Sequence, residues 1–235
     1  MLLLIGVMYG AGFFAPAIVL KKTVYGDGIF YYSWIRSIVL DQDVNFTNEY
    51  TNFGATQPVT PIGIPGNKYT IGPALLWTPT FLWTHGLIHG DGYTLPYQLA
   101  VGITSVFYVL VGLLLLFTLL RQFFNSAVSI ATTLATAFAT NLFFYGSLDT
   151  VNSHALSFFA AVLFLTLLLR KPRNWLLVGA SLGLVGLVRT QDVVLGILVL
   201  PFILPKHIPR FLVAALLAFF PQLIAWQLLY GTFWI

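Results

Sequence analysis

Residues 97–120 read YQLAVGITSVFYVLVGLLLLFTLL, without a single charged side chain. A helix needs about 20 mostly apolar residues to cross the hydrocarbon core of a bilayer, so this stretch predicts a membrane-spanning helix. Other apolar segments lie before and after it, at residues 2–20, 70–88, 126–146, 153–169, 174–188, 191–204 and 211–230. Together they predict an all-α fold: a polytopic transmembrane helical bundle with about seven spanning helices.

The composition of the chain excludes a soluble domain. Of its 235 residues, 58% are hydrophobic and 8% are charged, and the mean hydropathy is +0.89. A soluble domain contains about 25% charged residues, so membrane lipids must surround much of this surface. No basic run accompanies the net charge of +4, so nucleic acid is not an expected partner. The absence of cysteine excludes disulfides and thiolate metal ligands.

Charges in the short connections predict the orientation of the bundle. Basic connections contain Arg121, residues 170–173 and residues 206–210, and they alternate with connections that contain Asp91, Asp149 and Asp192. Cytoplasmic loops of membrane proteins are enriched in lysine and arginine. The basic connections are therefore expected in the cytoplasm and the acidic ones outside.

One long polar segment, residues 21–69, interrupts the apolar pattern and contains turn signals such as PIGIPG at 61–66. Inside it, residues 28–40 place Phe30, Trp34, Ile35 and Ile38 on one side of a helix and mainly polar residues on the other. That pattern predicts a juxtamembrane helix lying in the membrane interface.

The next segment, residues 70–88, contains Gly72, Pro73 and Pro79. Proline removes a backbone donor and kinks a helix. We therefore expect a proline-broken, re-entrant or juxtamembrane helix that returns to the side it left, so that residues 21–96 form one outer loop. If the segment instead crosses the membrane, loop 21–69 becomes cytoplasmic and the acidic residues separate.

Four stretches carry a resemblance: GDGIFYYSWIRS at 26–37, NKYTIGPALL at 67–76, NSHALS at 152–157 and GLVRTQD at 186–192. In this order and topology, they resemble the GT-C membrane glycosyltransferases, in the branch related to protein mannosyltransferases and aminoarabinose transferases of lipid A. The resemblance implies a sugar donor linked to polyprenyl phosphate and an active site at the outer membrane face, beneath the first outer loop.

The resemblance also implies roles for single residues. Asp27 stands where these enzymes have an acidic residue or pair, although Gly28 replaces the usual second acid. Lys68 matches a lysine that approaches the lipid phosphate. Such enzymes are longer, so residues 1–235 are expected to be a single transmembrane module, a fragment of a longer chain, in the plasma membrane of a prokaryote.

The chemistry of these residue types supports a transfer site. A carboxylate such as Asp27 can act as general base toward an acceptor oxygen, although it could also simply cap the following helix. Lys68 and Arg189 could bind phosphate, or could extend from helix ends to the lipid headgroups. Asp149 and His154 flank a helix start, where ionisable residues near membrane depth are functional candidates. We expect these five residues to converge on one cavity, with Asp27 catalytic and the others binding substrate.

Asp41 and Asp43 form an acidic pair that could bind a divalent cation, or could be solvated after a helix end. His85 and His89 have the spacing of metal ligands on a helix, but no third ligand is nearby, so no zinc site is predicted.

Two other classes of protein remain open. A transporter or flippase would also carry charges among its helices, but near the bilayer midplane and often within inverted repeats, whereas here the acids gather at one face. A non-catalytic scaffold derived from the enzyme module would fit the missing second acid.

Overall fold

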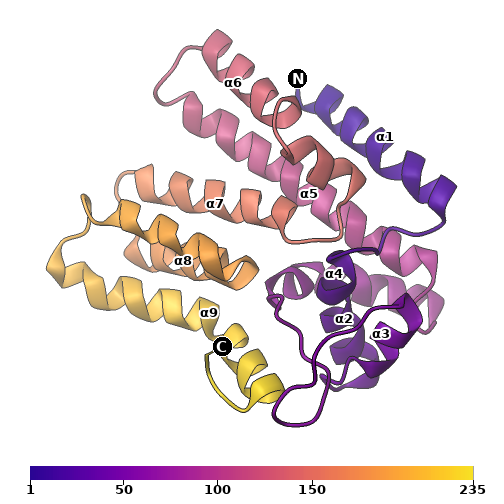
Figure 1. The fold of residues 1–235 in the computed structure, drawn as a ribbon. Coiled ribbons are helices and arrows are strands. Elements are labelled where there is room, and N and C mark those ends of the chain that lie inside the picture. Colours follow the sequence, from indigo (N-terminus) through magenta and orange to yellow (C-terminus); the bar gives the residue numbers. More distant parts are fainter. Residues whose placement is uncertain (235) are drawn as a thin grey trace.

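The computed structural model describes residues 1–234, and every regular element in that range is a helix (Figure 1). The α-helices are α1 (Leu2–Leu20), α2 (Gly28–Arg36), α3 (Thr47–Phe53), α4 (Gly72–Ile88), α5 (Leu95–Leu120), α6 (Ser126–Phe138), α7 (His154–Leu169), α8 (Trp175–Val188) and α9 (Ile208–Tyr230). Short π-helices η1 (Ser37–Asp41) and η2 (Phe144–Leu148) and 3-10 helices η3 (Thr190–Val199) and η4 (Pro205–His207) connect them. The predicted all-α membrane bundle is confirmed.

The chain divides into a bundle, formed by α1 and α5–α9, and a loop unit, formed by α2, η1, α3 and α4 (Figure 1). Three helices are long and apolar enough to cross a membrane: residues 2–20, 95–120 and 205–230. The other apolar helices, α6, α7, α8 and η3, are shorter. Segment 191–204 begins as a 3-10 helix. Because a 3-10 helix rises about 2 Å per residue, it spans a given thickness of the membrane with fewer residues than an α-helix does.

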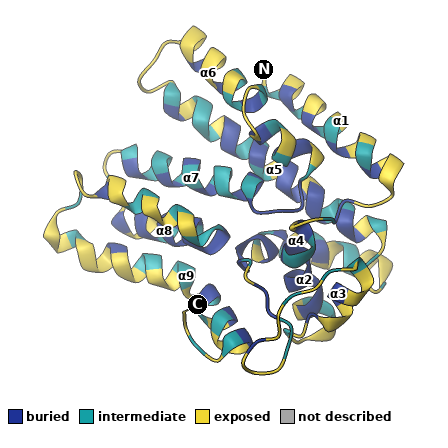
Figure 2. Ribbon diagram, in the orientation of Figure 1, coloured by how far each residue is buried: buried dark blue, intermediate teal, exposed yellow. Residues whose placement is uncertain are grey.

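The surface of the bundle is suited to lipid. Large aliphatic side chains on the outer sides of α1 and α9 are exposed, among them Leu3, Val19, Leu216 and Leu217. Figure 2 shows exposed residues along both helices. In a lipid environment such side chains need no further cover, whereas every backbone polar group must be satisfied inside the helices.

The bundle has two chemically different ends. The connections that hold Arg121, residues 170–173 and residues 206–207 lie at one end, here called the basic end (Figure 1). The other end, called the cavity end, joins the loop unit: Thr23 N–H donates to Gln98 Oε1, and Tyr25 donates to the Leu148 carbonyl. All 7 acidic residues belong to the loop unit or to connections at the cavity end.

Glycines let α9 approach α8 closely. A Cβ atom at Gly179 would lie 2.1 Å from the Phe211 carbonyl oxygen, and one at Gly183 would lie 2.3 Å from that of Ala215. Small residues at such spacing allow helix backbones to meet in membranes. This contact fixes α9 on the bundle, and thereby places the end of α9 against the loop unit.

Helix α2 differs from its prediction as an interfacial helix. It is buried on most sides, including its polar residues Ser33 and Arg36. The polar side can be buried because its groups are paired inside the protein. Tyr32 donates to the Gly92 carbonyl at 2.5 Å, and Arg36 donates to Glu49 at 2.8 Å and to Asp41.

Helix α4 is one continuous helix, so the prediction that proline breaks it is wrong. Pro73 lies in its first turn, where the missing N–H would have no helical partner. Pro79 lies inside and removes one hydrogen bond without ending the helix. The start of α4 contacts the end of α8, and His85 near its end bonds to Tyr97 in the first turn of α5. Both ends of α4 therefore lie at the cavity end of the bundle.

Candidate active site

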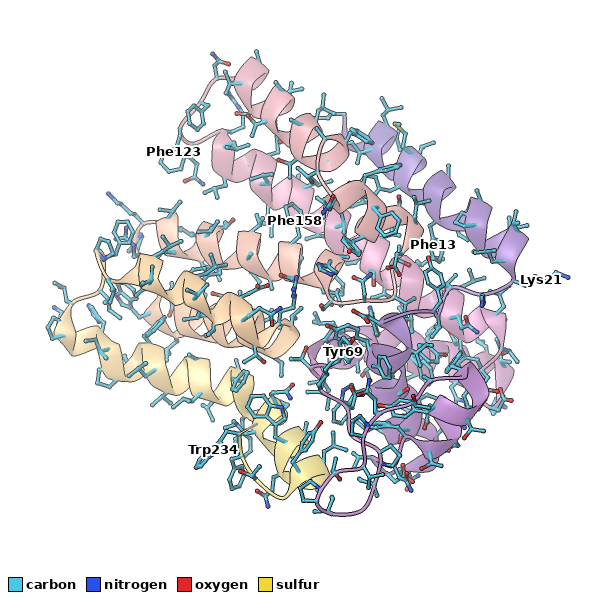
Figure 3. The ribbon with its side chains drawn as sticks, viewed as in Figure 1. Phe13, Lys21, Tyr69, Phe123, Phe158 and Trp234 are labelled. Atoms are coloured by element: carbon cyan, nitrogen blue, oxygen red, sulfur yellow. The ribbon has the colours of Figure 1, made fainter. Side chains whose placement is uncertain are left out.

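A cavity of about 700 Å³ lies between the loop unit and the cavity end of the bundle. Its wall contains polar and aromatic side chains from segments far apart in the chain: Asp27, Tyr31, Lys68, Tyr69, Thr70, Tyr145, Asp149, Asn152, Ser153, His154, Arg189, Thr190, Gln191 and Trp226. Tyr69, labelled in Figure 3, lies between the two parts of the molecule. All five residues expected to converge line this one cavity.

Asp27 precedes α2 but does not cap it, since its side chain makes no hydrogen bond to the backbone of the first turn. Instead, Asp27 Oδ1 accepts a hydrogen bond from the Tyr69 hydroxyl at 2.6 Å. The adjacent Gly28 packs against the Val151 backbone, where a Cβ atom would lie 2.3 Å from the carbonyl oxygen. There is thus no room for the second acid that the resemblance would place at this position.

The segment that carries Lys68 is held by hydrogen bonds from both sides. Asn67 donates to the Phe30 carbonyl at 2.8 Å, and Trp34 donates to the Tyr69 carbonyl at 2.9 Å. Thr70 donates to the Val188 carbonyl at 2.6 Å. The backbone is fixed, while the Lys68 ammonium is exposed and lies 5.4 Å from the centroid of the Tyr69 ring.

Arg189, directly after α8, is held by protein groups rather than extending to lipid headgroups. Its Nη1 donates to His154 Nδ1 at 2.9 Å. With the Gln191 carboxamide oxygen facing the guanidinium, that oxygen accepts from Nη2 at 2.7 Å and from Nε at 3.2 Å. Asp192 Oδ2 lies 4.0 Å from Nε, at the limit of an ion pair. The guanidinium therefore has a fixed position in the cavity wall.

Asp149 and His154 reach the same cavity because the residues between them are not helical. Asn152 Oδ1 accepts from the His154 backbone N–H at 2.9 Å, and its amide donates to the Asp149 carbonyl. Burial raises the pKa of Asp149; a hydrogen bond from Asn152 opposes this shift, and the Asp27 carboxylate adds to it. The protonated form of Asp149 is thereby favoured relative to an exposed aspartate.

The cavity also contains aromatic residues that sequence reasoning missed: Tyr31, Tyr69, Tyr145 and Trp226. Tyr31 and Tyr69 lie inside two of the four quoted stretches, and this position was the signal that could have found them. Trp34 and Trp77 are fully buried, and Trp83 is exposed but does not line the cavity. Trp226 is the one placed to contact a sugar.

Asp41 and Asp43 lie outside this cavity. Arg36 and Asn48 both donate to Asp41, and Ser37 donates to Asp43 at 2.7 Å, so the pair serves contacts within the loop unit. Within residues 1–234, no group of three His, Asp or Glu side chains is placed to hold a metal ion. A divalent cation at this pair would have two carboxylates as ligands, and the carboxylate of Asp41 is already paired with Arg36.

The sequence of this helical membrane bundle places it among the membrane glycosyltransferases of the GT-C class. The chain belongs to the dolichyl-phosphate-mannose-protein mannosyltransferase family, whose sequence profile matches residues 96–229. This part includes Asp149, His154 and Arg189, whereas Asp27 and Lys68 precede it. No curated protein and no solved structure gives a significant match.

Proposed function

We propose that this chain transfers a sugar from a polyprenyl-phosphate-linked donor to an acceptor hydroxyl at the outer membrane face. One observation carries the proposal: two carboxylates, Asp27 and Asp149, and two cations, Lys68 and Arg189, line a single cavity at one end of a membrane bundle. Such a transfer requires a carboxylate to accept the proton of the acceptor hydroxyl and cations to bind the lipid phosphate.

The reaction assigns each group a task. The acceptor oxygen bonds to the anomeric carbon, its proton passes to Asp27, and the bond from that carbon to the phosphate oxygen breaks. The lipid phosphate leaves with additional negative charge, which Arg189 and Lys68 stabilise. Asp149, which lines the same cavity and whose pKa is raised by burial, is placed to hydrogen-bond to a sugar hydroxyl.

The charges in the connections support the proposed membrane face. With the basic end in the cytoplasm, the cavity opens at the outer face, in the plasma membrane of a prokaryote. The lipid tail of the donor then approaches from the bilayer, while the sugar and the acceptor occupy the polar cavity. The position of the charged cavity at one end of the bundle disfavours a transporter, whose substrate groups lie near the midplane.

Substitution Asp27→Asn tests the proposal, with Asp91→Asn as a matched control. Asp91 is exposed, lies outside the cavity and accepts a hydrogen bond from Tyr93 N–H, which asparagine can also accept. We expect Asp27→Asn to reduce sugar transfer by on the order of a hundredfold or more. The control should transfer at the rate of the unmodified protein.

The assay uses the full chain in membranes with a radiolabelled polyprenyl-phosphate sugar. Near-normal transfer by Asp27→Asn would remove Asp27 from the mechanism. If the unmodified chain binds the lipid but transfers no sugar to any acceptor, the non-catalytic scaffold is the better description.

A further inference from the structure

The contact between Arg189 and His154 determines which nitrogen of the imidazole carries a proton. Arg189 Nη1 lies 2.9 Å from His154 Nδ1. A guanidinium has five N–H donors and no acceptor, and it does not lose its proton in proteins. The imidazole Nδ1 must therefore be the acceptor, with its lone pair directed at Arg189.

An imidazole whose Nδ1 accepts is neutral and carries its single proton on Nε2, because the imidazolium has a proton on both nitrogens. Among residues 1–234, Nε2 of His154 has no hydrogen-bond partner. His154 lies in the wall of the main cavity and also in that of a neighbouring cavity of about 500 Å³. Its N–H is thus available to a ligand.

The ring is fixed by further contacts. Tyr145 stacks on the imidazole with ring centroids 3.9 Å apart and planes inclined by 20°. Asn152 holds the His154 backbone N–H, and Gln191 holds the opposite edge of the Arg189 guanidinium. Rotation of the ring by half a turn would break the bond to Arg189 and place the Cδ2–H edge against the guanidinium.

We infer that His154 is a neutral imidazole protonated on Nε2, and that this N–H donates a hydrogen bond to a phosphate oxygen of the donor lipid. Arg189 is then a positioning residue for His154 as well as a phosphate ligand. Three of its N–H groups are used by His154 and Gln191, and two remain, one on each terminal nitrogen. The phosphate half of this inference rests on the proposed function, whereas the tautomer half does not.

The inference also limits the choice of general base. A neutral imidazole whose only lone pair is occupied by Arg189 cannot take a proton from the acceptor. The proton must pass to a carboxylate of the cavity, and Asp27 has one oxygen, Oδ2, that is not bonded to Tyr69. His154, although neutral, therefore acts on the leaving phosphate together with the cations Lys68 and Arg189.

The tautomer is measurable without any activity. In the full chain labelled with ¹⁵N-histidine in lipid nanodiscs, the nitrogen resonances report protonation at each of the 4 histidines, and His154→Gln assigns the resonance of interest. We expect Nε2 to be protonated and Nδ1 to be unprotonated at neutral pH. In Arg189→Met, the single tautomer should give way to a mixture. A protonated Nδ1 in the unmodified protein would overturn the inference, as would an unchanged tautomer in Arg189→Met.

Binding of a short-chain polyprenyl phosphate tests the role of the N–H. Glutamine can place an amide N–H near the position of Nε2, whereas asparagine is too short. We expect His154→Gln to bind nearly as the unmodified protein, and His154→Asn to bind roughly tenfold to a hundredfold more weakly. His89→Asn is the control, because His89 is exposed and lies outside both cavities.

Thermal unfolding in the same nanodiscs verifies that each variant is folded. Equal binding by His154→Asn and the unmodified protein would contradict the phosphate contact, and so would equal losses in His154→Asn and His154→Gln. A protein with the expected tautomer and binding but without transfer would contradict the proposed function and leave this inference in place.

Discussion

Gly28 offers the sharpest test of how the cavity is assembled. In Gly28→Ala, the added Cβ would lie 2.3 Å from the Val151 carbonyl oxygen, where ordinary contact begins at 3.4 Å. Both partners are backbone, so either the start of α2 or segment 149–153 must move by about 1 Å. Overpacking of this kind costs about 1–3 kcal/mol. Either movement would displace an acid of the cavity, because Asp27 directly precedes Gly28 and Asp149 lies in segment 149–153.

Two measurements should change together in Gly28→Ala. The free-energy cost corresponds to a fall in Tm of roughly 2–12 °C for a chain of this size. A misplacement of about 1 Å at the site should reduce transfer by on the order of a hundredfold. Gly28→Asp, which restores the second acid of the resembling enzymes, should be no better than Gly28→Ala, since its Cβ meets the same oxygen.

Gly86→Ala is the matched control. Gly86 lies inside α4, and a Cβ there would have no atom within 4 Å. Alanine is the better helix former by about 1 kcal/mol, so this variant should be as stable as the unmodified protein or slightly more so. The reasoning is refuted if Gly28→Ala unfolds at or above the Tm of the unmodified protein, or if Gly28→Asp increases transfer.

Three further outcomes are expected. Arg36→Met leaves Glu49 buried without its partner and should lower the stability by about 3–5 kcal/mol near neutral pH. Burial raises the pKa of Glu49, so protonation is favoured in the folded protein, and the variant should regain part of the lost stability as the pH falls. Thermal unfolding from pH 7 to pH 5 measures this. Asn45→Cys should react with an impermeant thiol reagent added outside intact cells, whereas Lys171→Cys should not; the reverse pattern would invert the bundle. Gln222→Leu removes the acceptor of the buried N–H at the start of α4, 3.0 Å away, and should lower the stability by about 1–3 kcal/mol; an unchanged Tm would mean that another group satisfies that N–H.

The sequence predicted the residues of the cavity better than their contacts. Charged residues are rare in this chain, so Asp27, Asp149 and Arg189 were conspicuous, and their alternation with basic connections indicated a shared end. Tyr69 was not selected, because 11 tyrosines occur in the chain and nothing local distinguishes the one that bonds to Asp27. Asp27 lies 42 residues away in the sequence, and the periodicity of apolar residues along a helix does not predict contacts at such a separation.

The same limitation explains the errors in the loop unit. Residues 28–40 show an amphipathic pattern, yet α2 is buried because Glu49, 13 residues beyond Arg36, neutralises its polar side. In α4, Pro79 was expected to break the helix, but packing of Trp77 and Phe81, both fully buried, holds the helix on each side of it. Hydropathy also cannot distinguish an α-helix from a 3-10 helix, so the form of segment 191–204 was not predicted.

The hydrogen bond between Ile71 N–H and Gln222 Oε1 has a consequence for biosynthesis. Its two residues are separated by 151 positions, and Trp226, part of the cavity wall, comes later still. At a synthesis rate of about 5–20 residues per second, the loop unit leaves the ribosome roughly 8–30 s before α9 can meet it. During that interval the Ile71 N–H lacks its acceptor and the cavity lacks one side, so the newly inserted chain passes through a state that membrane chaperones and proteases can recognise.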